Sequence, residues 1–262
     1  MSYAHIALPR LLIAAGLIVI AVILSRRSRL GLEKDLAWGA VRGAAQLIAI
    51  GYVLLLLFDH EKPSWVLLLL AVMLIAAAGT AARRVEHGPP RSVLFPRAMV
   101  AIGAGTAVAV VPVFAGVVPL HPWYEARYLV PISGMMLSNA MNTVALSFER
   151  VFASARTEAD QVEALLALGA TPQQALQRQV RATLRAALLP TINGLLTVGL
   201  VALPGMMTGQ IVSGIDPEQA VRYQIVILYQ LVVVAAVAGV VAVAFSRRLL
   251  FTPRAQLVLP KG

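Results

Sequence analysis

Long apolar runs separated by short polar loops dominate this sequence of 262 residues. Seven of the runs are each long enough to cross about 30 Å of hydrocarbon as an α-helix. We place these spans at residues 6–25, 36–58, 64–82, 98–118, 128–148, 188–213 and 220–246. Only 13% of the residues are charged, whereas soluble domains carry about a quarter. The sequence therefore predicts an all-α polytopic membrane protein, with residues 1–262 forming a single transmembrane domain.

Basic residues gather in the loops on one side of these spans. They are Arg26, Arg27, Arg29 and Lys34, then Arg83, Arg84, Arg91 and Arg97, then Arg150, Arg156, Arg178, Arg181 and Arg185, and finally Arg247, Arg248, Arg254 and Lys261. Because cytoplasmic loops are rich in Lys and Arg, we expect the N-terminus outside and the C-terminus inside. The same placement argues against a nucleic-acid-binding face, although the formal net charge is +10.

One polar segment, at about residues 149–187, interrupts the apolar runs on the cytoplasmic side. It reads as two short helices. Thr157 is expected to cap the first helix and Gly169 to end it in the left-handed conformation. Thr171 is expected to cap the second helix, with Pro172 at its first position and a glutamine three residues later completing a capping box.

A helix–Gly–helix element of this kind suits two roles. It can offer a docking surface to a partner protein. Alternatively, it can rest on lipid headgroups, since Arg178, Arg181 and Arg185 share one helical face and their side chains can extend to the interface. Spacing alone leaves both roles open.

The fifth and sixth spans each contain a Gly–Met–Met triplet beside a proline and polar side chains. Proline and glycine break helices, and broken helices near the membrane midplane often build transport sites. The residues predicted to line a substrate pathway are Met135, Met136, Asn139, Asn142, Met206, Met207 and Gln210. Thioethers favour soft cations and amide oxygens harder ones, but methionine also fills irregular gaps in a core. The sequence leaves metal ligation and packing both open, and no metal ligand is assigned.

Several kinds of chemistry have no candidate residues. There is no cysteine, and Lys34, Lys62 and Lys261 all lie outside the pattern of a phosphate-binding loop. The four histidines lie in loops or at span ends, so a serine–histidine pair within the membrane lacks its base. We expect neither an enzyme nor a cofactor in this chain.

The chain resembles a known family over nearly its whole length. The carrying residues are the runs LGATPQQA, RAALLPT and TVGLVALPGMMTGQIVSGIDPEQAVRYQI, together with LEKDL, the Arg42–Gln46 pair and PISGMMLSNAM upstream. These resemble the Fet-type permeases of ABC transporters, described as iron exporters, a family that also includes the plant aluminium-tolerance permeases. The segment from Glu163 to Gly169 is similar to the start of an importer coupling motif, with Leu165 in place of an alanine.

The resemblance implies a permease subunit in a bacterial inner membrane. It implies a separate ATP-binding subunit that holds ATP and Mg, two copies of each subunit, and a metal cation as substrate, iron by resemblance. It also favours docking over lipid contact for the helix pair. The residues expected to couple the permease to the ATPase are Glu163, Gly169, Thr171, Pro172 and Arg178.

A second hypothesis is an ion- or proton-coupled secondary transporter that needs no ATPase. Such a transporter normally needs a titratable residue deep within a span. Glu149 and Arg42 come nearest to this, and both lie close to the predicted cytoplasmic boundary. The residues therefore favour the ATP-driven permease over the secondary transporter.

Overall fold

The computed structural model describes residues 8–59, 62–118 and 121–259, and two compact units divide the chain. The first unit, Met1–Glu61, holds α1 (Leu8–Arg27) and α2 (Glu33–Asp59), which pack together as a hairpin. Two residues with positive φ, Arg29 and Gly31, reverse the chain between them. The Ser25 hydroxyl closes this turn by donating to Glu33 at 3.2 Å and accepting from the Leu32 amide.

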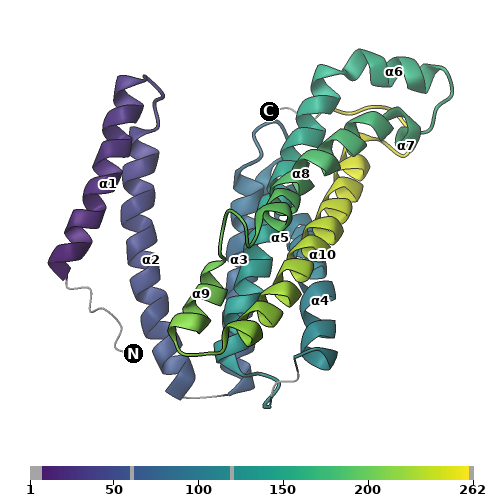
Figure 1. Cartoon of the computed structure of the whole chain (residues 1–262). Coiled ribbons are helices and arrows are strands. Elements are labelled where there is room, and N and C mark those ends of the chain that lie inside the picture. The colour runs from purple at the N-terminus through teal and green to yellow at the C-terminus, as the bar shows by residue number, and fades with distance from the viewer. Residues whose placement is uncertain (1–7, 60–61, 119–120, 260–262) are drawn as a thin grey trace. The chain divides into compact units, whose positions relative to one another are not determined.

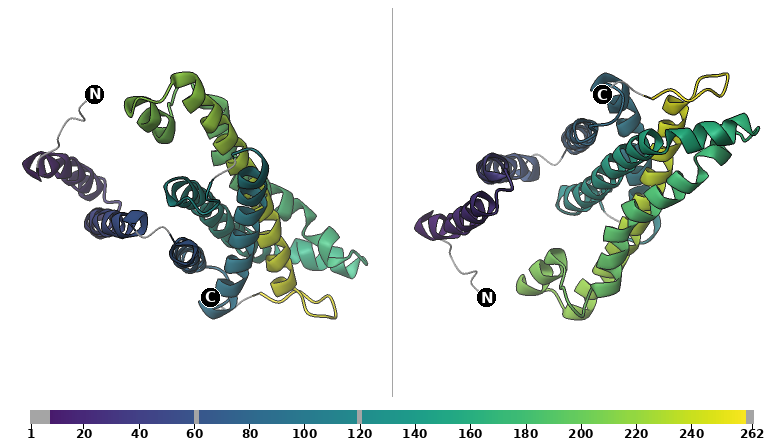
Figure 2. Two further views of the ribbon diagram at one scale, coloured as in Figure 1. Left: turned by 90° about the horizontal axis from the view of Figure 1, so that it is seen from below. Right: turned by 90° about the horizontal axis from the view of Figure 1, so that it is seen from above.

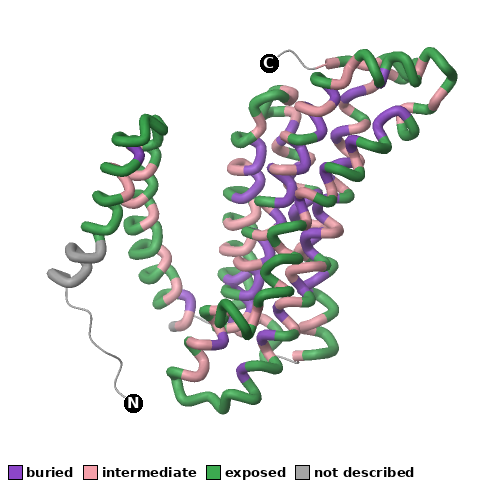
Figure 3. Tube along the Cα trace, turned by 45° about the horizontal axis from the view of Figure 1, so that its top comes forward, coloured by how far each residue is buried: buried purple, intermediate pink, exposed green. Residues whose placement is uncertain are grey.

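The second unit, Lys62–Gly262, is a bundle of long helices. Its members are α3 (Pro63–Arg83), α4 (Arg91–Gly116), α5 (Ala126–Thr157), α8 (Gln177–Thr197) and α10 (Pro217–Leu250). Within the unit α10 packs against α4, α5 and α8, and α3 packs against α4 and α5 (Figure 1). Views along the bundle show α5 and α10 between the other helices (Figure 2). Buried residues concentrate on these two helices (Figure 3).

Three short helices complete the second unit. The helices α6 (Ala159–Ala167) and α7 (Pro172–Ala175) protrude at the end of the bundle where α5 and α10 both finish (Figure 1). The third, α9 (Gly205–Val212), lies between α8 and α10 in the chain and packs against α10.

Small residues allow close contact between α4 and α10. A Cβ at Gly105 of α4 would lie 3.0 Å from both the Ala238 Cβ and the Val234 carbonyl oxygen of α10. Glycine at this position therefore brings the two backbones together, as small residues do between membrane helices.

Five helices are long and apolar enough to cross a membrane: α2 over Glu33–Phe58, and the whole of α3, α4, α5 and α10. They confirm five of the predicted spans and the all-helical membrane class. The first predicted span corresponds to α1, although residues 6–7 lie outside the described part of the chain. The predicted loop 83–97 is shorter than expected, because α4 already begins at Arg91. The total of seven spans and the orientation stay predictions.

The two predicted helix breaks turn out differently. The sixth span, 188–213, is broken into α8 and α9 by residues 198–204, as the glycine and proline there suggested. The prediction of a broken fifth span is wrong, because α5 is one continuous helix that includes Pro131. Pro131 lies in the second turn of α5, where the end of a helix can adjust without disturbing the packed turns that follow.

Candidate functional site

The break between α8 and α9 forms one wall of a cavity. The chain leaves the helix at Val198, turns through Gly199 at φ +80°, and resumes as α9 after Pro204. The Gly199 amide donates to the Ala202 carbonyl at 3.0 Å, so residues 198–204 form a compact turn. We refer to these residues as the 198–204 turn. Glycine is needed in it because only glycine adopts this φ at little cost.

The cavity, which we name the amide cavity, has a volume of about 400 Å³. The lining residues come from four helices and the turn: Met135, Asn139, Pro190, Thr191, Gly194, Thr197, Val198, Ala202, Pro204, Gly205, Met206, Gln224, Ile227, Leu228 and Leu231. It lies at mid-depth in the bundle, because Asn139 and Leu231 are near the middle of α5 and α10.

The cavity brings together three of the seven residues predicted to line a pathway: Met135, Asn139 and Met206. These come from segments about seventy residues apart in the sequence. A thioether from each Gly–Met–Met triplet therefore reaches one cavity. The role of these side chains in transport stays a prediction.

The other four predicted residues do not line the amide cavity. Met136 is fully buried in the bundle and Met207 is nearly so. The Asn142 side chain accepts a hydrogen bond of 2.8 Å from the Arg84 guanidinium. The side-chain amide oxygen of Gln210, Oε1, is buried with no hydrogen-bond partner among the described residues.

Asn139 connects three helices at the cavity wall. Its Nδ2 donates to the Leu231 carbonyl of α10 at 2.8 Å, and its Oδ1 accepts from the Thr191 hydroxyl of α8 at 3.1 Å. Inside a membrane such bonds stabilise helix association by about 0.6 kcal/mol each. The α5 amide therefore fixes where α8 and α10 lie around the cavity.

Gln224 of α10 is the main cavity residue that sequence reasoning missed. It is 6% exposed, and its Oε1 has no hydrogen-bond partner within the described part of the chain. An unsatisfied buried polar group costs about 1–3 kcal/mol. A glutamine inside an apolar run was the available signal, but Gln230, one and a half turns further on, gives the same signal. Gln230 donates through its Nε2 to the Ala109 carbonyl at 3.0 Å and ties α10 to α4, although its Oε1 likewise has no partner among the described residues.

The donor groups of the amide cavity are neutral: two thioethers, two amides and threonine hydroxyls. Among the described residues no three His, Cys, Asp or Glu side chains gather to hold a metal ion. The cavity can therefore offer sulfur and neutral oxygen ligands to a passing cation.

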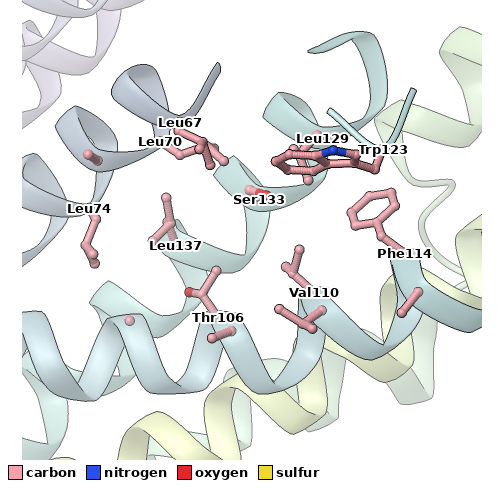
Figure 4. A pocket seen from close by; sticks show the side chains of 15 residues that line it. Leu67, Leu70, Leu74, Thr106, Val110, Phe114, Trp123, Leu129, Ser133 and Leu137 are labelled. Atoms are coloured by element: carbon pink, nitrogen blue, oxygen red, sulfur yellow. The ribbon is translucent and has the colours of Figure 1, made fainter. Parts of the chain in front are cut away.

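A larger pocket of about 560 Å³ lies between α3, α4 and α5 (Figure 4). Its wall is almost entirely hydrocarbon, with Leu74, Val110, Phe114 and Leu137 among the residues that face it. Size alone would favour this pocket as a binding site. We assign the site to the smaller amide cavity, because polar groups that converge on a cavity determine what binds there.

The polar segment folds as a helix pair around Gly169. This residue has φ +87°, its amide donates to the Leu166 carbonyl, and the Ala170 amide donates to the Leu165 carbonyl, both at 3.0 Å. That pattern is the Schellman motif, and it confirms the predicted end of α6. Thr171 then caps α7 with the full capping box and Pro172 at its first position, also as predicted.

The predicted cap at Thr157 is wrong. Helix α5 continues through this residue, and the Thr157 hydroxyl donates to the Ala153 carbonyl one turn back. A threonine can satisfy its hydroxyl within a helix in this way, so its presence alone did not fix a helix start. The protruding element is accordingly shorter than 149–187 at its beginning.

Polar contacts hold α6 against α8. The Arg178 guanidinium donates to Glu158 at 2.7 Å and to Gln161 at 2.8 Å, and the buried Gln179 amide donates to Glu158 at 2.6 Å. The side chain of Arg178, a predicted coupling residue, is thus directed at its own chain. The predicted residues Glu163, Gly169 and Thr171 are exposed, and Pro172 is half-buried. Leu168, beside Gly169, is 84% exposed.

Comparison with known proteins identifies the family of this chain. A model of the uncharacterised protein family UPF0014 matches residues 8–251. The chain belongs to the UPF0014 family. The match includes the amide cavity and the helix pair, and it confirms the expected resemblance. No solved structure matches this chain.

Relatives in the UPF0014 family align over almost the whole chain. The probable iron export permease protein FetB of Escherichia coli (strain K12) is 35% identical over 95% of this chain and 94% of its own length. The UPF0014 membrane protein slr1647 of Synechocystis sp. is 36% identical over 93% of both chains. The UPF0014 membrane protein STAR2 of Oryza sativa subsp. japonica is 37% identical over 93% of this chain and 84% of its own.

Proposed function

We propose that this chain is the permease subunit of an ATP-driven ABC transporter that exports a metal cation across a bacterial inner membrane. In this proposal a separate subunit binds and hydrolyses ATP, and two permeases work together. Iron is the proposed cation, since the relative FetB is named a probable iron export permease. The membrane class and the family are established above, whereas the substrate, its direction and the ATPase belong to the proposal.

The observation that carries the proposal is the amide cavity at mid-depth, with an unpaired amide oxygen on Gln224. Six buried side-chain oxygens of the described residues lack a partner, and that of Gln224 is the one whose residue lines this cavity. A buried polar group without a partner is costly for a protein that needs only to fold. Its cost is explained if a substrate or water contacts it during transport. The broken helix beside it supports the same interpretation, since transport sites are often built from such helices.

Helix α8 offers a direct mechanical connection from a partner to this cavity. The part of α8 from its start beside the α6–α7 helix pair to Thr191 at the cavity wall spans about 21 Å. A displacement of the helix pair would shift α8 as a unit and so move Thr191 against Asn139. We propose that the ATPase docks on exposed Leu168 and on Glu163, Gly169, Thr171 and Pro172. Arg178 would hold α6 to α8 so that the motion is passed on.

The deciding experiment measures metal movement in proteoliposomes that contain this chain and its candidate ATPase. With ATP present, Fe²⁺ should move across the bilayer, and omitting ATP or the permease should stop it. Iron movement driven by an ion gradient, with no ATPase present, would contradict the proposal in favour of a secondary transporter. ATP hydrolysis that is stimulated by the permease without iron movement would retain the coupling and reject iron as the substrate.

A further inference from the structure

Helix α8 buries a polar face where it packs against α5 and α10 (Figure 1). Its buried residues are Gln179, Thr183 and Ala187, which recur at every fourth position and so share one side of the helix. Thr191 continues the same spacing and lines the amide cavity. The buried stripe of α8 therefore runs from the helix pair, where Gln179 bonds to Glu158, to the cavity.

Helix α5 carries a matching polar stripe. Asn139 lines the amide cavity, and Thr143 and Ser147 follow it at intervals of four residues. Thr143 is 3% exposed and Ser147 is fully buried. From Asn139 to Ser147 the stripe runs about 12 Å toward the end of the bundle that carries the helix pair. We name Thr143, Ser147, Gln179 and Thr183 the polar seam.

The three helices meet at Gly239 of α10. A Cβ at this position would lie 3.3 Å from Leu184 Cδ2 of α8 and from Thr143 Cγ2 of α5, and 3.8 Å from Ser147 Oγ. Glycine therefore lets α10 approach both other helices closely, as small residues do between membrane helices. The polar seam is packed shut at this level, between the amide cavity and the helix pair.

Two oxygens of the polar seam have no hydrogen-bond partner. A hydroxyl within a helix can donate to the carbonyl one turn back, as Thr143 does to Asn139 at 3.0 Å. The Ser147 hydroxyl has no partner among the described residues, and neither has the Gln179 Oε1, although both side chains are buried. An unpaired buried oxygen destabilises a packed interface. Ser147→Ala would keep the packing without that cost, so packing alone does not explain the serine.

We propose that the polar seam is the route by which a metal cation reaches the amide cavity from the end of the bundle that carries the helix pair, and that this structure shows the route closed. When α8 moves away from α5, the unpaired oxygens of Ser147 and Gln179 become ligands for water or for the passing cation. Neutral oxygens suit harder divalent cations, whereas the thioethers of the cavity suit softer ones. The inference rests on the proposed function for its cation and its direction, but the opening of the route is measurable without transport.

Cysteine labelling tests whether the polar seam opens, because the natural chain has no cysteine. Ser147→Cys and Thr183→Cys are compared with Ala101→Cys on α4, which is also buried but lies outside the seam. Each variant is placed in sealed vesicles with the candidate ATPase and ATP, and a membrane-impermeant, positively charged methanethiosulfonate is added. The exposed Leu168→Cys, labelled in parallel, identifies the vesicle orientation that presents the helix pair to the medium.

We expect both seam cysteines to react at least tenfold faster than Ala101→Cys, and faster from the face that carries the helix pair than from the other. The proposal would be overturned if either seam cysteine reacted no faster than Ala101→Cys, or if labelling were no faster from that face. Fast labelling that is the same without the ATPase would retain the route and count against the ATP-driven step of the proposed function.

A second measurement separates the role of a ligand from that of packing. Ser147→Ala and Thr106→Val each remove a buried hydroxyl oxygen that has no partner among the described residues, but Thr106 lines the apolar pocket of Figure 4. In proteoliposomes with the ATPase, Fe²⁺ transport by Ser147→Ala should fall about tenfold, comparable to the loss of one hydrogen bond to a charged group. Thr106→Val should transport as the unchanged chain does.

Equal transport by these two variants would overturn the ligand role of Ser147. If the unchanged chain moves no iron, the proposed function fails, and the labelling of the polar seam still decides whether the route exists.

Discussion

At the scale of single residues, neighbouring side chains of the same type have different surroundings. Gln224 and Gln230 both have an Oε1 without a partner among the described residues, but Gln224 lines the amide cavity, whereas Gln230 donates to the Ala109 carbonyl of α4. Met206 lines the amide cavity, whereas the next residue, Met207, is buried and does not line it. Each pair supplies a variant and its matched control.

Gln224→Leu should leave the bundle as stable as before, or more so, because it removes an unsatisfied buried group worth about 1–3 kcal/mol. Transport should nevertheless fall at least tenfold. Gln230→Leu should retain transport by the folded fraction, and it should be less stable than Gln224→Leu by about 1 kcal/mol, because it also loses the hydrogen bond to α4. Thermal unfolding and vesicle transport measure both. Normal transport by Gln224→Leu would remove this residue from the pathway.

Met206→Leu should change the rate or the metal selectivity of transport, because it removes a thioether from the cavity wall. Met207→Leu is a volume-conserving change in a packed position, so it should cost less than about 1.5 kcal/mol and leave transport unaltered. Competition between Fe²⁺ and a softer cation such as Cu⁺ in vesicles is the measurement. If both variants transport alike, the methionines serve packing alone.

At the scale of elements, side-chain hydrogen bonds join the helix pair to α8. Gly169 and the Thr171 capping box fix the angle between α6 and α7, and Glu158 holds α6 to α8 through Arg178 and Gln179. Val162 of α6 is fully buried. Leu168, at the C-terminal end of α6, is exposed.

Gly169→Val should uncouple ATP hydrolysis from the permease without removing the protein from the membrane. Valine is strained at φ +87°, so the end of α6 would shift even though nothing lies within 4 Å of a new Cβ. Gly169→Asn is the matched control, because asparagine tolerates the left-handed conformation and should retain most coupling. Permease-stimulated ATPase activity is the readout. Full stimulation by Gly169→Val would show that this turn is not the contact.

At the scale of the whole molecule, α10 organises the larger unit, with α4, α5 and α8 packed along its length. The amide cavity depends on this arrangement, since α5, α8 and α10 all contribute to its wall. Gly105, where an added Cβ would lie 3.0 Å from the α10 backbone, is therefore a position at which the bundle is sensitive to an added side chain.

Gly105→Val should destabilise the whole bundle by roughly 1–3 kcal/mol, because its Cβ would lie 3.0 Å from α10 backbone and side-chain atoms. Gly116→Val on the same helix meets open space and should change stability little. Thermal unfolding in detergent distinguishes the two. Equal unfolding temperatures would mean that α4 can move away from α10 at no cost.

Sequence alone determined the features that depend on local chemistry. Five of the spans followed from run length and hydropathy, and the end of α6 and the start of α7 followed from Gly169 and Thr171. The break before Pro204 was also readable, since glycine and proline interrupt a helix through their own backbone. Pro131 shows the limit of this reasoning, because a proline near a helix start need not end the helix.

The tertiary structure alone decided which polar residues meet. The sequence ranked Asn142 with Asn139, yet Asn142 bonds to Arg84 whereas Asn139 joins α5 to α8 and α10. It offered no reason to separate Gln224 from Gln230. These differences depend on how helices distant in the sequence rotate and pack against one another. The type of a residue does not show which way its helix face points in the bundle. Only the packed structure therefore shows which residues line the amide cavity.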